Sequence, residues 1–355
     1  MSLRALNTMN WEITAPYQDR MTSVAMIPMH TPEEALDELD YVTKLGVKVC
    51  VIPAGVGRPI AALEREAPGA YPLAAHFDCY GYESAHDYSP VWEAFRSHKI
   101  AVTSHGAPAL HYMPQARRSP SSYMYNHIMG HAYQQIELCL SLVMGGVPKR
   151  FPDLQFGFLE GGAGWGSDLL HGLEEHWEKR NAEGIQNYDP RKLDTALLGE
   201  LFAQYAPEAF HVEGEQRGNG AAPSTGPRDY AQYDEFASSL IDREEDFVDM
   251  FGRQFYFGCE ADDMSVYRAL DAKGNPLGVR LQPFFSSDIG HWDVPHLSEV
   301  LLESHQLVDK GLLSDADYRD FVFTNPAGLH LSMNPSFFDR TPVESAARDL
   351  VKAKA

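Results

Sequence analysis

Short apolar runs alternate with amphipathic stretches along most of the chain. The apolar runs lie at residues 22–29, 47–53, 100–104, 151–160, 254–259 and 281–285. We interpret them as strands, because they are too short for buried helices and are apolar enough to be covered on both faces. Helical periodicity between successive runs predicts a series of βαβ units, and therefore an α/β fold with a parallel sheet.

The first predicted helix is marked at both ends. Thr31 can cap the first turn, Pro32 fits the first helical position, and Glu34 completes a capping box. Gly46 stands where a helix of this length would end. We therefore expect a helix between the first two strands.

The remaining segments differ in character. Residues 1–20 show no clear periodicity and are expected to form a short helix or an N-terminal arm. The following stretches are interpreted as a long surface excursion (55–90), a long helix (122–144), a polar insertion (181–232), a further helix (236–251) and a C-terminal tail (341–355). The main domain is expected to span residues 21–340.

Polar residues gather where the predicted strands end. They are His105, Glu160, Glu260 and Asp288. In α/β folds ligands bind at the carboxyl ends of parallel strands, so this distribution indicates a site. Asp288, with His291 three residues later, could ligate a metal or carry a proton. The structural alternative is that the two residues cap the next turn.

His127 and His131 are four residues apart on a predicted helix and therefore share a face. The zinc-protease pattern needs a glutamate at position 128, where this chain has Ile128. We therefore favour a substrate-side or structural role for the pair over metal ligation.

Two other polar stretches have simpler interpretations. The glycine-rich turn at 160–165 could cradle an anion on its backbone amides, but it lacks the known nucleotide-binding patterns, so close backbone approach is the better interpretation. Glu260, Asp262 and Asp263 precede a predicted helix at 264–270, and we interpret them as charges at its N-terminus.

Composition narrows the class of protein. The 355 residues are 44% hydrophobic, which is enough for one large core. A net charge of −21 argues against nucleic acid or an anionic membrane as a partner. The four cysteines are far apart without a CxxC pair, which predicts a reducing, cytoplasmic location and no disulfide framework. The sequence has no apolar run long enough to cross a membrane and no signal-peptide pattern.

The order of these motifs resembles the amidohydrolase superfamily, in the amidohydrolase-related branch that includes aminocarboxymuconate-semialdehyde decarboxylase. The segments that carry the resemblance are TSVAMIP, VTSHG, NHIMGHAYQQIE, RFPDLQFGFLEGGAGW, FYFGCEADD, FSSDIGHWD and FVFTNPAGL, and together they cover most of residues 20–335. The resemblance implies a distorted (β/α)8 TIM barrel with a divalent metal at the carboxyl ends of its strands. Zinc is the expected metal, with manganese as the alternative.

The resemblance also assigns roles. His105 corresponds to the family's mid-chain metal-binding histidine, and Asp288 to a late aspartate that binds metal and moves a proton. Together with the interpretations of the individual residues, the expected catalytic set is Asp288, Glu160 and His291, and the expected substrate-binding set is Trp165, Arg117 and His131.

The chain departs from the family pattern in two places. The family's first strand carries an HxH or ExH metal pair, which the first strand found here lacks. The family's HxGG segment has Glu160 at the histidine position, so a carboxylate would act there as ligand or base. The first departure predicts a barrel that lacks its first one or two strands. Open sheet edges invite pairing, so a homo-oligomer is expected as one outcome.

These observations predict a metal-dependent enzyme that hydrolyses, or decarboxylates without oxidation, a small carboxylated or aromatic substrate. The sequence does not separate the two reactions. The alternative is a catalytically inactive, truncated barrel that serves as a binding or scaffold protein. An open-sheet oxidoreductase is disfavoured, because the glycine fingerprint of dinucleotide-binding folds is missing.

Overall fold

The computed structural model describes residues 2–71, 74–106, 119, 121–206 and 233–354, so the predicted substrate residue Arg117 lies outside the described residues. The chain divides into two compact units. The larger unit comprises Met1–Glu174 and Ser238–Ala355, and the smaller comprises Glu175–Ala237. Every candidate site residue that the structure describes belongs to the larger unit.

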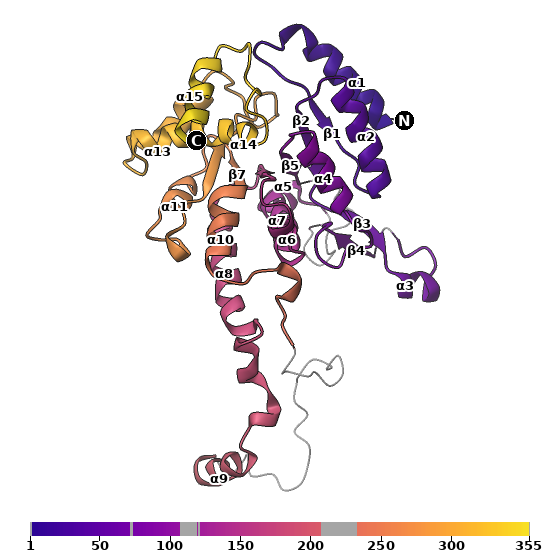
Figure 1. The fold of residues 1–355 in the computed structure, drawn as a ribbon, viewed down its shortest axis with the longest axis vertical. Coiled ribbons are helices and arrows are strands. Elements are labelled where there is room, and N and C mark those ends of the chain that lie inside the picture. Colours follow the sequence, from indigo (N-terminus) through magenta and orange to yellow (C-terminus); the bar gives the residue numbers. More distant parts are fainter. Residues whose placement is uncertain (1, 72–73, 107–118, 120, 207–232, 355) are drawn as a thin grey trace. The chain divides into compact units, whose positions relative to one another are not determined.

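The larger unit is built on a six-stranded parallel sheet with the order β1-β2-β5-β6-β7-β8 (Figure 1). Its strands are β1 (Val24–Met26), β2 (Val49–Pro53), β5 (Val102–His105), β6 (Phe156–Leu159), β7 (Phe255–Cys259) and β8 (Gln282–Phe285). The α/β class and all six predicted strands are confirmed. The sheet is open rather than a closed barrel, since among the described residues no pairing joins β8 to β1.

Helices connect the strands. In the larger unit they include α1 (Ser2–Thr14), α2 (Pro32–Lys44), α3 (Ala61–Glu66), α4 (Ser89–Ser97), α5 (Tyr123–His127), α6 (Gly130–Met144), α7 (Val147–Arg150), α10 (Glu245–Asp249), α11 (Val266–Leu270), α12 (Val300–Asp309), α13 (Asp315–Arg319), α14 (Asn325–Leu331) and α15 (Glu344–Lys354). Helix α8 (Gly164–Arg180) runs from the larger unit into the smaller, which also holds α9 (Thr195–Tyr205). Short 3₁₀ turns occur at Ala15–Tyr17, Gly184–Tyr188, Pro190–Lys192, Ala237–Ser239 and Pro276–Gly278, and π-helical turns at Met250–Gln254 and Asp320–Thr324.

A local sequence signal explains the start of α2. The Thr31 hydroxyl accepts a hydrogen bond from the Glu34 amide at 3.3 Å, so the predicted cap is confirmed. The segment expected as an arm or short helix is the helix α1.

None of the described helices is long and apolar enough to cross a membrane. All four cysteines are buried and unpaired.

Two predicted helices are interrupted. The helix expected over 122–144 breaks at Met129, whose φ of +59° is left-handed, and resumes as α6. Gly130, a poor helix former, follows directly. The helix expected over 236–251 is instead a 3₁₀ turn, then α10, then a π-helical turn. In both places the hydrophobic period continues across the break, so periodicity alone could not reveal it.

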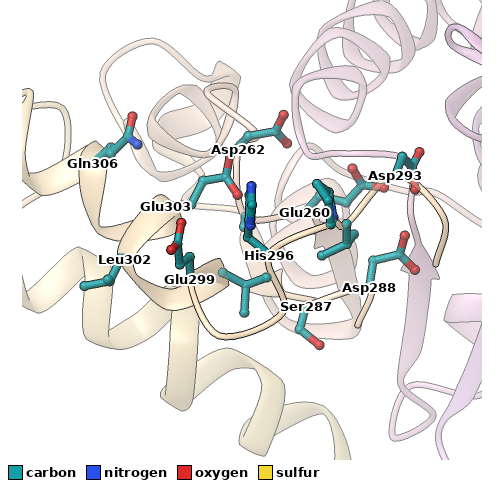
Figure 2. A pocket seen from close by; sticks show the side chains of 14 residues that line it. Glu260, Asp262, Ser287, Asp288, Asp293, His296, Glu299, Leu302, Glu303 and Gln306 are labelled. Carbon is teal, nitrogen blue, oxygen red and sulfur yellow. The ribbon is translucent and has the colours of Figure 1, made fainter. Parts of the chain in front are cut away.

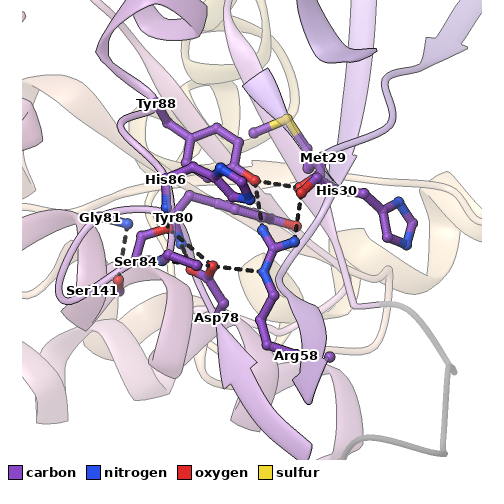
Figure 3. Close-up of polar contacts among 12 residues, drawn as sticks. Met29, His30, Arg58, Asp78, Tyr80, Gly81, Ser84, His86, Tyr88 and Ser141 are labelled. Carbon is purple, nitrogen blue, oxygen red and sulfur yellow. Dashed lines mark hydrogen bonds and ion pairs between the residues drawn. The ribbon is translucent and has the colours of Figure 1, made fainter. Parts of the chain in front are cut away.

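The segment 55–90, expected as a surface excursion, contains a second, antiparallel sheet of β3 (Val56–Pro59) and β4 (Ala75–Asp78). A buried ion pair anchors this hairpin (Figure 3): Arg58 Nε donates to the Asp78 carboxylate at 3.0 Å, and Arg58 Nη2 donates to the Tyr88 hydroxyl at 2.8 Å. Tyr88 in turn donates to the Met29 carbonyl at 2.6 Å. The hairpin is therefore tied to the loop that follows β1.

Side-chain amides bond the backbone of both edge strands. On β1, the Asn7 carboxamide donates to the Met26 carbonyl and accepts from the Met26 amide, both at 2.9 Å. On β8, Asn325 donates to the Pro283 carbonyl at 2.8 Å, and a proline has no amide hydrogen to leave unpaired. Side chains thus satisfy backbone groups that a neighbouring strand would otherwise pair with.

The half-buried side chain of His330 on α14 packs against an aromatic neighbour. Its ring lies flat on that of Phe337, with centroids 4.3 Å apart and planes 7° from parallel. Burial lowers the pKa of His330 to about 4, so the imidazole is neutral near neutral pH.

Candidate active site

The pairing of β5 with β6 brings two predicted site residues together. His105 is the last residue of β5, and Glu160 follows Leu159, which is its register partner on β6. His105 Nε2 makes a short hydrogen bond to a carboxylate oxygen of Glu160, and His105 Nδ1 lies 2.7 Å from the Gly106 carbonyl. Both ring nitrogens therefore face acceptors, which favours the protonated imidazole.

Glu160 adopts an uncommon backbone conformation, with a φ of +56°. A non-glycine residue in this region costs on the order of 1 kcal/mol or more, and such residues cluster at functional sites. The turn aims the carboxylate back toward β5, where only 16% of the side chain is exposed. This strain therefore accompanies the contact with His105.

A third residue, His131, reaches the same place from α6, which packs against β5 and β6. Its Nε2 lies 3.4 Å from the second Glu160 oxygen, and its ring centroid is 5.2 Å from that of His105. One donor atom from each of the three residues lies within 4.8 Å of the others. The structure thus groups His131 with residues that come from two strand ends.

The three groups influence one another's protonation. The hydrogen bond with Glu160 raises the pKa of His105, and the same bond lowers the pKa of Glu160. Burial lowers the pKa of His131, which is therefore a neutral imidazole with a lone pair to offer.

This donor set fits a divalent metal. Two imidazoles and a carboxylate are ligands that suit zinc, and imidazole and carboxylate also suit manganese. Three protein ligands leave further coordination positions for a substrate. His105, His131 and Glu160 would therefore hold such an ion, once the proton on His105 is released.

Asp288 belongs to a second group of candidate ligands. It follows β8 with a φ of +47°, and its carboxylate lies 3.4 Å from His291 Nδ1, which also makes a short bond to Asp293. Burial raises the pKa of Asp288. No group of three donor atoms among the described residues joins Asp288 to His105, so ligation of one metal by that pair stays a prediction.

Glu260 is a polar strand-end residue in the sequence, but its interpretation as a charge at a helix N-terminus leaves it out of the expected catalytic set. It follows β7, between the strands that lead to Glu160 and Asp288, and it shares a pocket of about 450 Å³ with Asp288 (Figure 2). Burial and then the neighbouring carboxylates, led by Glu160, raise the pKa of Glu260 to about 7. Its position after β7, equivalent to that of Glu160 after β6, was the available signal.

Trp165 and Glu260 also line a second pocket, of about 720 Å³, together with Glu160. Trp165 is only 5% exposed, and its ring packs on Phe158 and Phe257 with centroid distances of 5.5 and 5.0 Å. Packing therefore accounts for most of the Trp165 surface, and a role in substrate binding stays a prediction.

The glycine-rich turn before α8 is filled by protein groups. The Ala163 amide donates to Asp263 at 3.3 Å, and the Gly164 amide donates to the Ser265 hydroxyl at 3.0 Å. A Cβ atom on Gly162 would lie 2.7 Å from the Asp263 carboxylate. These glycines thus allow the turn and the segment after β7 to approach each other closely. Asp263 accepts hydrogen bonds from the Ala163 amide at the start of α8 and from the Ser265 amide in its own turn.

Comparison with known proteins gives a likeness in fold. No family model and no curated protein matches the chain. The amidohydrolase map2389c of Mycobacterium avium subsp. paratuberculosis K-10 is similar in structure, with a TM-score of 0.51 and 14% identity over 93% of this chain and 64% of that one. The 5-carboxyvanillate decarboxylase LigW of Sphingomonas paucimobilis is similar with a TM-score of 0.50 and 14% identity over 93% and 72%. The resemblance inferred from the motifs is therefore confirmed at the level of the fold.

Proposed function

We propose that this chain, which has the fold of amidohydrolase-superfamily proteins, is a member of that superfamily and a metal-dependent enzyme acting on a small carboxylated or aromatic molecule. The observation that carries the proposal is the convergence of His105, His131 and Glu160, whose donor atoms lie within 4.8 Å of one another. The similar structures are named as an amidohydrolase and a decarboxylase, which supports hydrolysis and decarboxylation as the two candidate reactions.

In this proposal His105, His131 and Glu160 hold zinc or manganese. When bound, such an ion supplies Lewis-acid polarisation of a substrate oxygen. The residues around it supply proton transfer. In hydrolysis, Asp288 accepts the proton of the attacking water and returns it to the leaving group.

Glu260 supports the decarboxylating version. Its pKa near 7 leaves a large fraction protonated at neutral pH, so it can deliver a proton. As the bond from the substrate carbon to the carboxylate breaks, the electron pair stays on that carbon and CO₂ leaves. The Glu260 proton then bonds to the carbon, which leaves Glu260 ionised until it takes a proton from water.

Metal content tests this proposal. We expect about one zinc or manganese ion per purified chain by plasma mass spectrometry, and loss of that ion in His105→Ala and in Glu160→Gln. His305→Ala is the matched control, because His305 makes an exposed pair with Asp309 on α12. Circular dichroism establishes that each variant is folded.

The same measurement can contradict the proposal. A folded wild-type chain without metal, after incubation with zinc and with manganese, would favour the alternative of a catalytically inactive binding or scaffold protein. Equal metal content in wild type and His105→Ala would place the ion elsewhere.

A further inference from the structure

A continuous row of aromatic rings leads from the candidate metal centre to the protein surface. The His105 and His131 ring centroids are 5.2 Å apart, and His127 follows at 5.4 Å from His131. Tyr123 stacks on His127 at 5.2 Å, and the Trp292 ring meets Tyr123 edge-on at 5.9 Å and 71°. The rings belong to β5, α6, α5 and the loop after β8, so only the fold brings them into one row.

The outer two rings are exposed. Trp292 is 64% exposed and Tyr123 is 56% exposed, although both are large side chains that usually bury most of their surface. Their contact with each other accounts for only part of each ring. Apolar surface that stays open to water beside a cluster of polar groups is typical of ligand sites, where aromatic walls receive the substrate and a few polar groups orient it.

Trp292 also lies beside the second group of candidate ligands. Its ring lies 6.0 Å from that of its neighbour His291, which contacts both Asp288 and Asp293. The loop that carries the candidate proton carrier Asp288 therefore also carries the outer aromatic ring. Tyr123 is thus linked to the metal centre through His127 and His131, and Trp292 is linked to the second group of candidate ligands through His291.

We propose that Tyr123 and Trp292 form the outer wall of the substrate site and select molecules with a flat aromatic ring over saturated molecules of the same size and charge. This inference rests on the proposed function, in which the metal centre takes the polar end of the substrate. Aromatic rings gain edge-to-face and offset-stacked contacts with other aromatic rings that a puckered saturated ring cannot make.

Benzoate and cyclohexanecarboxylate test the inference, because both carry one carboxylate on a six-membered ring and only benzoate is flat. Binding to the full chain is measured by titration calorimetry, with and without added Mn²⁺. We expect benzoate to bind on the order of 3- to 10-fold more tightly, the range that one or two aromatic contacts supply. Trp292→Ala and Tyr123→Ala should each bring this ratio close to one.

Two further variants separate ring recognition from general damage. Trp292→Phe keeps a ring at the same position and should retain most of the preference. Tyr17→Ala removes a 52% exposed tyrosine from the turn before β1, at the opposite strand ends from the site, and should leave the ratio unchanged.

Each outcome decides the inference. A wild-type ratio near one, a ratio that survives both alanine variants, or no binding of either compound at about 10 mM overturns it. Metal content measured on the same samples distinguishes the two proposals. A metal-containing protein without ring preference removes the aromatic wall and keeps the proposed function. A metal-free protein that still prefers benzoate contradicts the proposed metal centre and keeps the aromatic wall.

Discussion

Three carboxylates stand at the ends of β6, β7 and β8, yet each has a different electrostatic environment. The hydrogen bond from His105 lowers the pKa of Glu160, whereas burial raises the pKa of Glu260 to about 7 and also raises that of Asp288. Acid and base roles in an active site follow from such divergence between neighbouring groups. Glu160 is thus suited to be a ligand, and Glu260 to be an acid.

The pKa of Glu260 predicts how its substitution changes stability with pH. The ordinary value is 4.5 and the folded value is about 7, so the folded chain binds this proton more tightly than the unfolded chain. Ionised Glu260 therefore destabilises the fold, with a cost that begins above about pH 4.5 and is complete above about pH 7. Glu260→Gln removes the charge and should be more stable than wild type at about pH 8, but not at about pH 4.

Urea unfolding at the two pH values measures this difference, with exposed Glu12→Gln on α1 as the control. Equal destabilisation of Glu260→Gln at both pH values would contradict this prediction. It would show that the side chain makes stabilising contacts and that burial of its charge costs little. Under the proposed function, the same variant should also lose decarboxylase activity while it retains metal.

At the scale of elements, the β3–β4 hairpin depends on one buried carboxylate. Burial alone would raise the pKa of Asp78, but hydrogen bonds from the Tyr80 amide, the Ser84 hydroxyl and Arg58 outweigh it, so the pKa is lowered. The Asp78 side chain is fully buried, and that of Arg58 is 15% exposed. The hairpin is therefore held by an ion pair whose partners each need the other.

Removal of one partner should be costly. We expect Asp78→Ala to lower the free energy of unfolding by about 3–5 kcal/mol, because it leaves the Arg58 guanidinium buried without its counter-charge. Asp339→Ala removes a carboxylate from an exposed pair with Arg348 and should cost less than about 1 kcal/mol. Urea denaturation followed by circular dichroism compares them, and similar losses in both variants would contradict the account.

The helix break at Met129 shows where element prediction from sequence reaches its limit. Ile128 and Met129 continue the apolar pattern, and both are exposed in the structure. The break ends α5 and starts α6, and His127 and His131 lie on opposite sides of it. The spacing of four residues therefore predicted correctly that the two histidine rings lie close together. They do so without sharing one continuous helix.

At the scale of the whole molecule, an open parallel sheet is stabilised by what covers its edges. Asn7 is 1% exposed and is held by Glu38, to which it donates at 2.9 Å, while it bonds both backbone groups of Met26. A partner strand for β1 would have to displace this side chain. Assembly of the chain into a homo-oligomer stays a prediction, and strand addition at β1 is not its simplest route.

Asn7→Ala tests the protected edge. The variant leaves the Met26 backbone groups unpaired, so we expect it to lose about 1–3 kcal/mol of stability and to self-associate more readily at high concentration. Asn10→Ala makes the same change in helix propensity on α1 and serves as the control. Urea unfolding and light scattering follow the two effects. A variant that matches Asn10→Ala in both would show that the amide pairing is dispensable.

The sequence alone determined the six strands, the α2 cap and the chemistry at the strand ends, because periodicity and capping are properties of neighbouring residues. The tertiary structure decided which of these groups meet. His105 and Glu160 are 55 positions apart, and His131 joins them from a helix rather than a strand. The pKa of Glu260 depends on burial and on carboxylates from other strands, and the edge contact of Asn7 depends on where α1 packs. These effects depend on which residues are neighbours in the folded chain, and the order of residues along the chain does not specify those neighbours.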